Sequence, residues 1–176
     1  MRYLIVLIVL LTCNLHAKTA WDKGVSLYNA SQFDEAENYF RQQLQFHPQH
    51  LPSQIYLADI LAQRKEWLQA WQTYTRLLKL HPTLAELHYK TSGALAMYAK
   101  TQSYWFKFSH REEIKLGFLQ AISLNPVYVD AHWAMVEYGL VVPSWLGGGV
   151  DLAQQYAQNL QRISPVDGYL ALGRIA

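Results

Sequence analysis

The sequence predicts an all-α solenoid built from antiparallel helical hairpins. The first observation is an internal repeat, because residues 33–48 return as residues 67–82 after a shift of 34 positions. The second is helical spacing within a copy, where Ala36, Phe40 and Leu44 lie at i, i+4 and i+8 on one face. The third is a proline at the end of each copy, which cannot continue a helix interior. Copies at a period in this range are typical of stacked helical hairpins.

Residues 1–17 are predicted to be a secretory signal peptide that precedes a folded domain of residues 18–176. Arg2 gives a positive start, residues 4–11 are an apolar run, and Ala17 is a small residue at a cleavage point. The run is far shorter than the ~20 residues of a membrane span. We therefore expect an exported protein that is located in the periplasm.

Cys13 is the only cysteine, and it lies in the predicted signal peptide. A lipoprotein would be anchored through it, but Thr12 stands where such signals carry Gly, Ala or Ser, which disfavours this anchor. The mature chain would then have no disulfide or thiol chemistry. The formal net charge is +2, and no block of like charges occurs, which argues against a nucleic-acid partner.

Four hairpins and the start of a further helix are predicted. Their bounds are about residues 19–48, 51–82, 84–126 and 129–165, with the further helix at 168–176. The closing residues Pro126 and Pro165 come 44 and 39 positions after the preceding closing prolines. The residues beyond the 34-residue period are expected in the turns within the third and fourth hairpins, at residues 100–109 and 143–149. Both turns should project from the same edge of the solenoid.

The helices of these two longer hairpins can be placed from their flanking signals. In the third hairpin the first helix is expected over residues 84–99. Ser109 and Glu112 form a capping-box pattern that is expected to start the second helix. In the fourth hairpin, helices are expected over about residues 129–141 and 150–163.

The repeat resembles the tetratricopeptide repeat in three features. These are the small residue at Gly24 or Ala58, the alanine followed by an aromatic residue in the second helix, and the closing proline. The resemblance covers most of the mature chain. It implies a right-handed solenoid whose first helices line a concave groove. The Pro-x-x-x-Gly-Gly loop that starts at Pro143 is similar to a loop in a group of exported bacterial tetratricopeptide proteins. This similarity supports export but implies no particular activity.

The resemblance implies that the groove binds a segment of another protein. The expected partner-binding residues are Trp21, Tyr28, Asp59, Glu86, Tyr89, Trp133 and Glu137. Members that hold acidic chaperone tails carry Lys and Asn in the first repeat, whereas Trp21 and Val25 stand there, so that partner is disfavoured. A segment with apolar anchors suits this groove better. The predicted function is therefore a non-enzymatic interaction scaffold, although the same aromatic residues could simply pack between helices.

An aromatic run in the predicted turn at residues 100–109 suggests an alternative function. It comprises Tyr104, Trp105, Phe106 and Phe108, with Lys107 among them. If exposed, it could dock a partner or contact lipid or a membrane protein at the envelope surface. If instead Trp105 and Phe108 fold back, they would cover the stack between hairpins, since an exposed patch is a liability. The sequence leaves both possibilities open.

The sequence disfavours a metal site and a phosphate site. His47 and His81 occupy equivalent turns with His50 nearby, but no His-Glu-x-x-His or cysteine pair accompanies them. Residues 147–149 are glycines before a helix, yet the Lys and Ser or Thr of a phosphate loop are missing, and Asp151 fits a helix cap. We predict no cofactor, no metal and no catalytic residue.

The further helix at residues 168–176 is mostly apolar and has no second helix to follow it. Solenoids need a terminal element with a polar outer face. Either the chain is the front part of a longer array, or a second copy covers this end and gives a homodimer. The sequence leaves both possibilities open.

Overall fold

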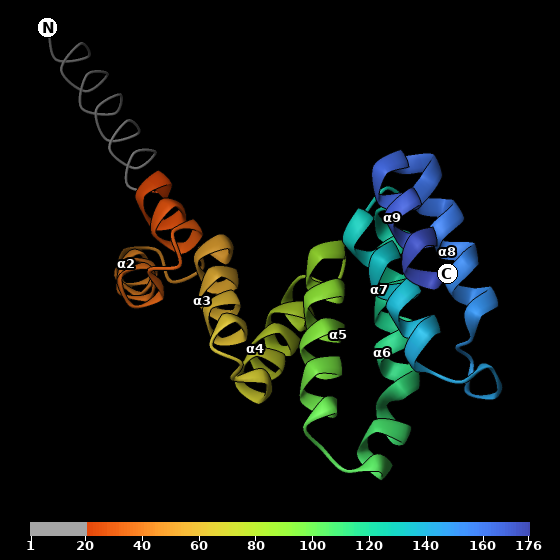
Figure 1. The fold of residues 1–176 in the computed structure, drawn as a ribbon. Helices are drawn as coiled ribbons and strands as arrows, with labels where there is room; N and C mark the ends of the chain where they lie inside the picture. Colours follow the sequence, from red (N-terminus) through yellow and green to blue (C-terminus); the bar gives the residue numbers. More distant parts are fainter. Residues whose placement is uncertain (1–20) are drawn as a thin grey trace, which may run out of the picture. The chain divides into compact units, whose positions relative to one another are not determined.

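The computed structural model describes residues 21–176, so the predicted signal peptide and Cys13 lie outside the described residues. Within this range the regular structure is helical and contains no strand (Figure 1), which confirms the all-α prediction. None of the helices in the described range is long and apolar enough to cross a membrane. The described part of the chain divides into two compact units, residues 21–64 and 65–176.

The first unit contains three helices in its described part. They are the helix of residues 21–29, α2 (Phe33–Phe46) and α3 (Leu51–Gln63). Its core centres on Ala36 and Phe40 of α2 and Ile60 of α3, which are almost fully buried. Half-buried aromatic side chains surround this core and include Trp21 and Tyr28.

The second unit continues the succession of helices. They are α4 (Trp67–Leu80), α5 (Ala85–Lys100), α6 (Tyr104–Leu124), α7 (Val129–Val141), the 3₁₀ turn η1 (Ser144–Leu146), α8 (Val150–Ile163) and α9 (Pro165–Ile175). Each helix packs against the next, and α7 also contacts α5 and α9. Helices α5, α7 and α9 therefore form a row, with α6 and α8 between them in the chain (Figure 1).

Small residues lie where helices approach closely, as the repeat pattern predicts. A Cβ atom added to Gly24 would lie 2.3 Å from Cδ1 of Tyr39 on α2. A Cβ atom added to Gly139 of α7 would lie 2.7 Å from the backbone nitrogen of Ala153 on α8. Side chains larger than these would separate the paired helices, because protein interiors are closely packed.

The turns that connect successive hairpins share a hydrogen bond. After the first three closing prolines, the side chain six positions further along contacts the carbonyl oxygen of the proline. The pairs are Gln54–Pro48 at 2.7 Å, His88–Pro82 at 2.8 Å and His132–Pro126 at 2.9 Å. Because a carbonyl oxygen only accepts, Nε2 of each histidine is the donor. The repeat register therefore continues through the longer third hairpin.

The second helix of the third hairpin begins earlier than predicted. Helix α6 starts at Tyr104, and Oγ of the preceding Ser103 accepts a hydrogen bond from the backbone N–H of Phe106. Ser109, which was expected to start the helix, lies inside it and donates to the carbonyl oxygen of Phe106. The predicted turn at residues 100–109 is wrong, because the aromatic run forms the first part of α6.

One helix cap and one other helix start also differ from expectation, although α7 and α8 have the predicted bounds. Gly149 occupies the cap position of α8, so Asp151 lies in the first turn and is not the cap. Helix α9 begins at Pro165 rather than at residue 168. Proline is tolerated at a first helical position because its missing N–H would have no acceptor within the helix there.

Candidate functional site

Four of the predicted partner-binding residues lie on the row of α5, α7 and α9. Glu86 and Tyr89 come from α5, and Trp133 and Glu137 come from α7. Polar residues of all three helices accompany them. We call this surface the α5–α7–α9 face and define it by Glu86, Tyr89, Lys90, Gly93, Asp130, Trp133, Glu137, Asp167 and Arg174.

Tyr89 connects α5 to the beginning of α7. Its ring centroid lies 5.2 Å from that of Tyr128, directly before α7, and 6.0 Å from that of Phe118 on α6. Burial raises the pKa of the Tyr89 hydroxyl, and the nearby carboxylate of Asp130 raises it further. Tyr89 thus contributes to packing and leaves only part of its ring to the surface.

Two polar contacts join α7 to α9. Trp133 Nε1 donates a hydrogen bond to Asp167 Oδ1 at 2.9 Å, and Ser164 Oγ donates to the other carboxylate oxygen. Hydrogen bonds from Ser164 and from Trp133 hold the pKa of the Asp167 carboxyl below its usual value. Arg174 Nε donates to Glu137 Oε1 at 3.2 Å. The side chains of Trp133 and Glu137 are therefore held in place by α9.

The exposed part of the α5–α7–α9 face is acidic and open. Four carboxylates, those of Glu86, Asp130, Glu137 and Asp167, share it with the two cations of Lys90 and Arg174. Lys90 Nζ lies 3.4 Å from Glu86 Oε1, and Arg174 pairs with Glu137. The carboxylates of this face therefore outnumber its basic side chains by two. A Cβ atom added to Gly93 would meet no atom of a neighbouring element within 4 Å. A polypeptide segment could reach the α5 backbone at this position.

The other three predicted partner-binding residues lie in the first unit and take part in its packing. The Trp21 ring lies 5.7 Å from the ring of Phe40 and 5.5 Å from that of Tyr56. The Tyr28 ring lies 5.1 Å from the ring of Tyr56, and Asp59 is only 8% exposed. Partner contact through Trp21, Tyr28 and Asp59 stays a prediction.

The aromatic run at the start of α6 is divided between packing and exposure. Phe106 folds back, since its ring stacks on His110 at 3.9 Å and lies 5.4 Å from the ring of Tyr98. Tyr104 is 64% exposed and Trp105 is 75% exposed. Of the two possibilities that the sequence leaves open, exposure therefore holds for Trp105, whereas Phe106 packs back against α5 and Phe108 is half-buried.

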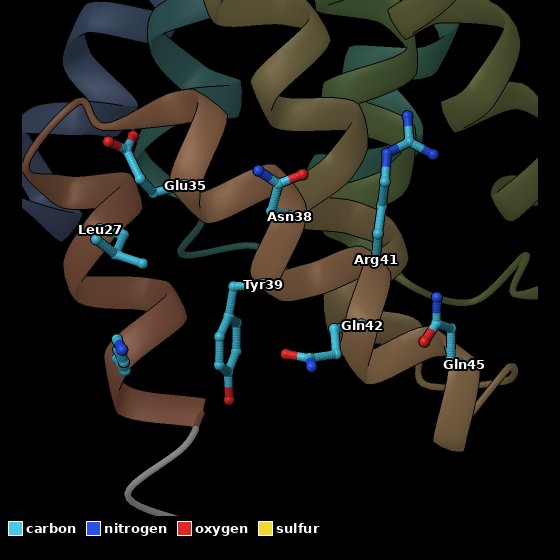
Figure 2. A pocket seen from close by; sticks show the side chains of 8 residues that line it. Leu27, Glu35, Asn38, Tyr39, Arg41, Gln42 and Gln45 are labelled. Atoms are coloured by element: carbon cyan, nitrogen blue, oxygen red, sulfur yellow. The ribbon is translucent and has the colours of Figure 1, made fainter.

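A shallow hollow of about 760 Å³ lies on the first unit, between the helix of residues 21–29 and α2. Its lining residues are Lys23, Leu27, Glu35, Asn38, Tyr39, Arg41, Gln42 and Gln45, and none of them was predicted to bind a partner. Figure 2 shows polar side chains along α2, with Tyr39 between the two helices. The polar lining is typical of a solvent-facing helix surface.

The glycine loop before α8 does not offer free donors to an anion. The backbone N–H groups of Gly147, Gly148 and Gly149 donate to the carbonyl oxygens of Ser144, Pro143 and Gly139, at 3.0, 3.1 and 2.8 Å. Gly147 and Gly149 have φ of 85° and 99°, which L side chains rarely adopt. The glycines therefore serve the turn itself.

The histidines weighed as metal ligands form no cluster with other ligands. Among residues 21–176, no group of three or more His, Cys, Asp and Glu side chains could hold a metal ion. His50 Nδ1 lies 2.8 Å from Ser53 Oγ, so this ring already has a protein partner.

The last helix leaves an apolar stripe uncovered in the second unit. Val166, Tyr169 and Leu170 of α9 are 70%, 67% and 60% exposed, and a Cβ atom on Gly173 would meet nothing within 4 Å. These positions share one side of the helix at i, i+3, i+4 and i+7. A homodimer through this end stays a prediction.

Solved structures resemble this arrangement closely enough to assign the fold. No family model and no curated protein matches the sequence. TTC0263, a thermophilic TPR protein of Thermus thermophilus, is similar with a TM-score of 0.71 and 20% identity, over 89% of this chain and 83% of that chain. The chain has the tetratricopeptide-repeat fold.

Other tetratricopeptide-repeat structures agree with this assignment. MamA has a TM-score of 0.62 and 21% identity, over 86% of this chain and 81% of that chain. YrrB, described as a TPR protein with an unusual peptide-binding site, has a TM-score of 0.63 and 16% identity, over 88% of this chain and 72% of that chain. At such identities the similarity concerns the fold alone.

Proposed function

We propose that this protein is an exported, non-enzymatic scaffold that binds a segment of another protein on the α5–α7–α9 face. Export is inferred from residues 1–17, with their positive start, apolar run and small residue at a cleavage point. Segment binding is supported by the fold, because the tetratricopeptide-repeat protein YrrB is described as having a peptide-binding site.

The observation that carries the proposal is the open surface at Gly93 on a face where carboxylates outnumber basic side chains. Because no atom of a neighbouring element would lie within 4 Å of a Cβ there, a bound segment meets no obstacle on α5. The surplus of carboxylates favours a segment with Lys or Arg residues, since complementary charge promotes association. Partly exposed rings at Tyr89 and Trp133 offer apolar contact beside these charges.

The test selects peptides from a displayed random library on the full chain and then measures their affinity by fluorescence anisotropy. We expect the selected peptides to combine basic and apolar residues and to bind more weakly as salt rises. Gly93→Arg and Gly93→Glu form a matched pair, because both place a long side chain in the same open position with opposite charge. Affinity should fall about tenfold or more for Gly93→Arg relative to Gly93→Glu.

Two outcomes would contradict the proposal. One is a library that yields no enriched sequence on the correctly folded chain, as judged by circular dichroism. The other is a set of peptides whose affinity is the same for Gly93→Arg, Gly93→Glu and the parent protein, because such peptides bind elsewhere.

A further inference from the structure

We propose that the beginning of α6 binds the surface of an anionic membrane. Tyr104 and Trp105 are among the most exposed aromatic side chains of the described residues, at 64% and 75%. Tyrosine and tryptophan prefer the membrane–water interface, because each combines an apolar ring with a polar group. This surface shares no residue with the α5–α7–α9 face, so it is a second, independent interaction site.

The two exposed rings belong to an ordered cluster, which we call the α6 tip and define by Tyr104, Trp105, Phe108 and Arg111. Ring centroids of Tyr104 and Trp105 lie 6.2 Å apart, and those of Trp105 and Phe108 lie 6.3 Å apart. Arg111 Cζ lies 4.1 Å from the Phe108 ring centroid. Phe108 and Arg111 are half-buried, and the Arg111 guanidinium donates to the carbonyl oxygen of Phe108, so these two side chains support the exposed rings of Tyr104 and Trp105.

The charge of this segment complements anionic lipid. Residues 100–113 contain Lys100, Lys107 and Arg111 together with Glu112 and Glu113 at the inner edge of the tip, which leaves one net positive charge. Lys107 and Lys100 are exposed, so both ammonium groups are available to headgroups. Basic residues close to aromatic ones are attracted to anionic lipids, while the rings enter the interface.

The dimensions of the α6 tip favour lipid over a protein partner. Helix α6 has 21 residues against 14 in α8, so it is longer by about 10 Å at 1.5 Å per residue. Its first turn lies at an outer end of the second unit, beside the turn from α5 (Figure 1). Four side chains are few against the roughly 20–30 residues on each side of a stable protein interface. Shallow insertion into a headgroup layer needs no such complementary surface.

The test measures co-sedimentation of the full chain with vesicles of phosphatidylcholine and with vesicles of equimolar phosphatidylcholine and phosphatidylglycerol. The quantity compared is the additional binding that phosphatidylglycerol causes, because residues 4–11 are apolar and can bind both kinds of vesicle. For the combined variant Trp105→Ala, Lys107→Glu we expect the partition coefficient for this additional binding to fall about tenfold. Lys107→Glu alone should give part of this loss, and added salt should weaken binding by the parent protein.

Leu116→Ala provides a matched control, since Leu116 lies on the same helix and is 55% exposed but is outside the α6 tip. It should bind vesicles as the parent protein does, with an unchanged circular dichroism spectrum for all variants. The inference is overturned if phosphatidylglycerol adds no binding, or if the Trp105→Ala, Lys107→Glu variant binds as the parent does. It is also overturned if Leu116→Ala lowers binding equally. Each result is independent of peptide binding at Gly93.

Discussion

His132 Nε2 lies 2.9 Å from the carbonyl oxygen of Pro126, and this contact joins the start of α7 to the turn before it. His132 is 4% exposed, and its ring also lies 5.8 Å from the ring of Tyr156 on α8. The same contact is made by Gln54 with Pro48, so a glutamine amide and a histidine imidazole serve the same purpose. Each fixes the angle at which a new hairpin leaves the closing proline.

This equivalence predicts the effect of two substitutions at His132. His132→Ala removes both the donor of this partly buried hydrogen bond and a buried, packed ring, so the free energy of unfolding should fall by about 1–3 kcal/mol. His132→Gln keeps an N–H donor at the distance that Gln54 uses and should recover at least half of the loss. Urea denaturation followed by circular dichroism measures both. Equal destabilisation by the two variants would show that the ring's packing matters and the hydrogen bond does not.

Glycines inside two helices of the second unit should respond oppositely to alanine. A Cβ atom at Gly139 would lie 2.7 Å from Ala153 N and 2.9 Å from the carbonyl oxygen of Gly149, so Gly139→Ala must move α8. We expect a loss of about 1–3 kcal/mol from this overpacking. Gly93→Ala meets no neighbour and should gain about 0.5–1 kcal/mol, because alanine is the better helix former. Thermal unfolding of both variants checks this, and a melting temperature of Gly139→Ala at or above that of the parent protein would contradict the packing of α7 on α8.

Ala70 of α4 is a close-approach position according to the repeat, and it is fully buried. Ala70→Leu should overpack its surroundings and lower the free energy of unfolding by about 1–3 kcal/mol. Gln69→Leu introduces the same side chain at the neighbouring, exposed position and should change the free energy of unfolding by less than about 0.5 kcal/mol. The denaturant midpoint measures both. Equal midpoints for the two variants would mean that α4 presents a different face to its neighbours.

The sequence predicted the helix bounds well where glycine and proline mark them. Helices α7 and α8 end or begin beside Pro143 and Gly149, and both have the expected residues. The start of α6 could not be predicted, because Ser109 and Glu112 carry a capping pattern and the aromatic run before them has little helix preference of its own. Packing of Phe106 on Tyr98 and His110 supports the earlier start, and that contact depends on α5.

The sequence predicted which helices carry the candidate site but not the hydrogen bonds and ion pairs of its side chains. Repeat register placed Glu86, Tyr89, Trp133 and Glu137 on first helices, and the structure brings them to one row. The pairs that hold Trp133 and Glu137 involve Asp167 and Arg174, which are 34 and 37 positions further along the chain. Asp167 lies before the helix that was expected at residues 168–176, so its pair with Trp133 was not foreseen. Arg174 lies inside that expected helix, but its pairing with Glu137 depends on the packing of α9 on α7. An aromatic groove was expected, whereas the exposed surface carries more carboxylates than basic side chains.

The contact between Trp133 and Asp167 should make stability depend on acid pH. Hydrogen bonds from Ser164 and Trp133 lower the pKa of Asp167 in the folded chain. A lowered pKa means that the ionised form stabilises the fold above the pKa of the unfolded chain. This contribution is lost as the pH falls through the folded value. Asp167→Asn cannot ionise but keeps an acceptor for Trp133 Nε1, so its melting temperature should fall less than that of the parent protein between pH 7 and about pH 3, below the usual aspartate pKa of about 3.9.

Trp133→Phe tests the same hydrogen bond by removing its donor, because phenylalanine keeps an aromatic side chain but has no N–H to donate. Without this donor the pKa of Asp167 should rise toward its usual value, and the acid-induced fall in melting temperature should become smaller. The double variant Trp133→Phe, Asp167→Asn should show little further change in its pH dependence beyond that of Asp167→Asn, since the two side chains act through one hydrogen bond. If Asp167→Asn has the same pH dependence as the parent protein, Asp167 does not stabilise the contact between α7 and α9 through its charge.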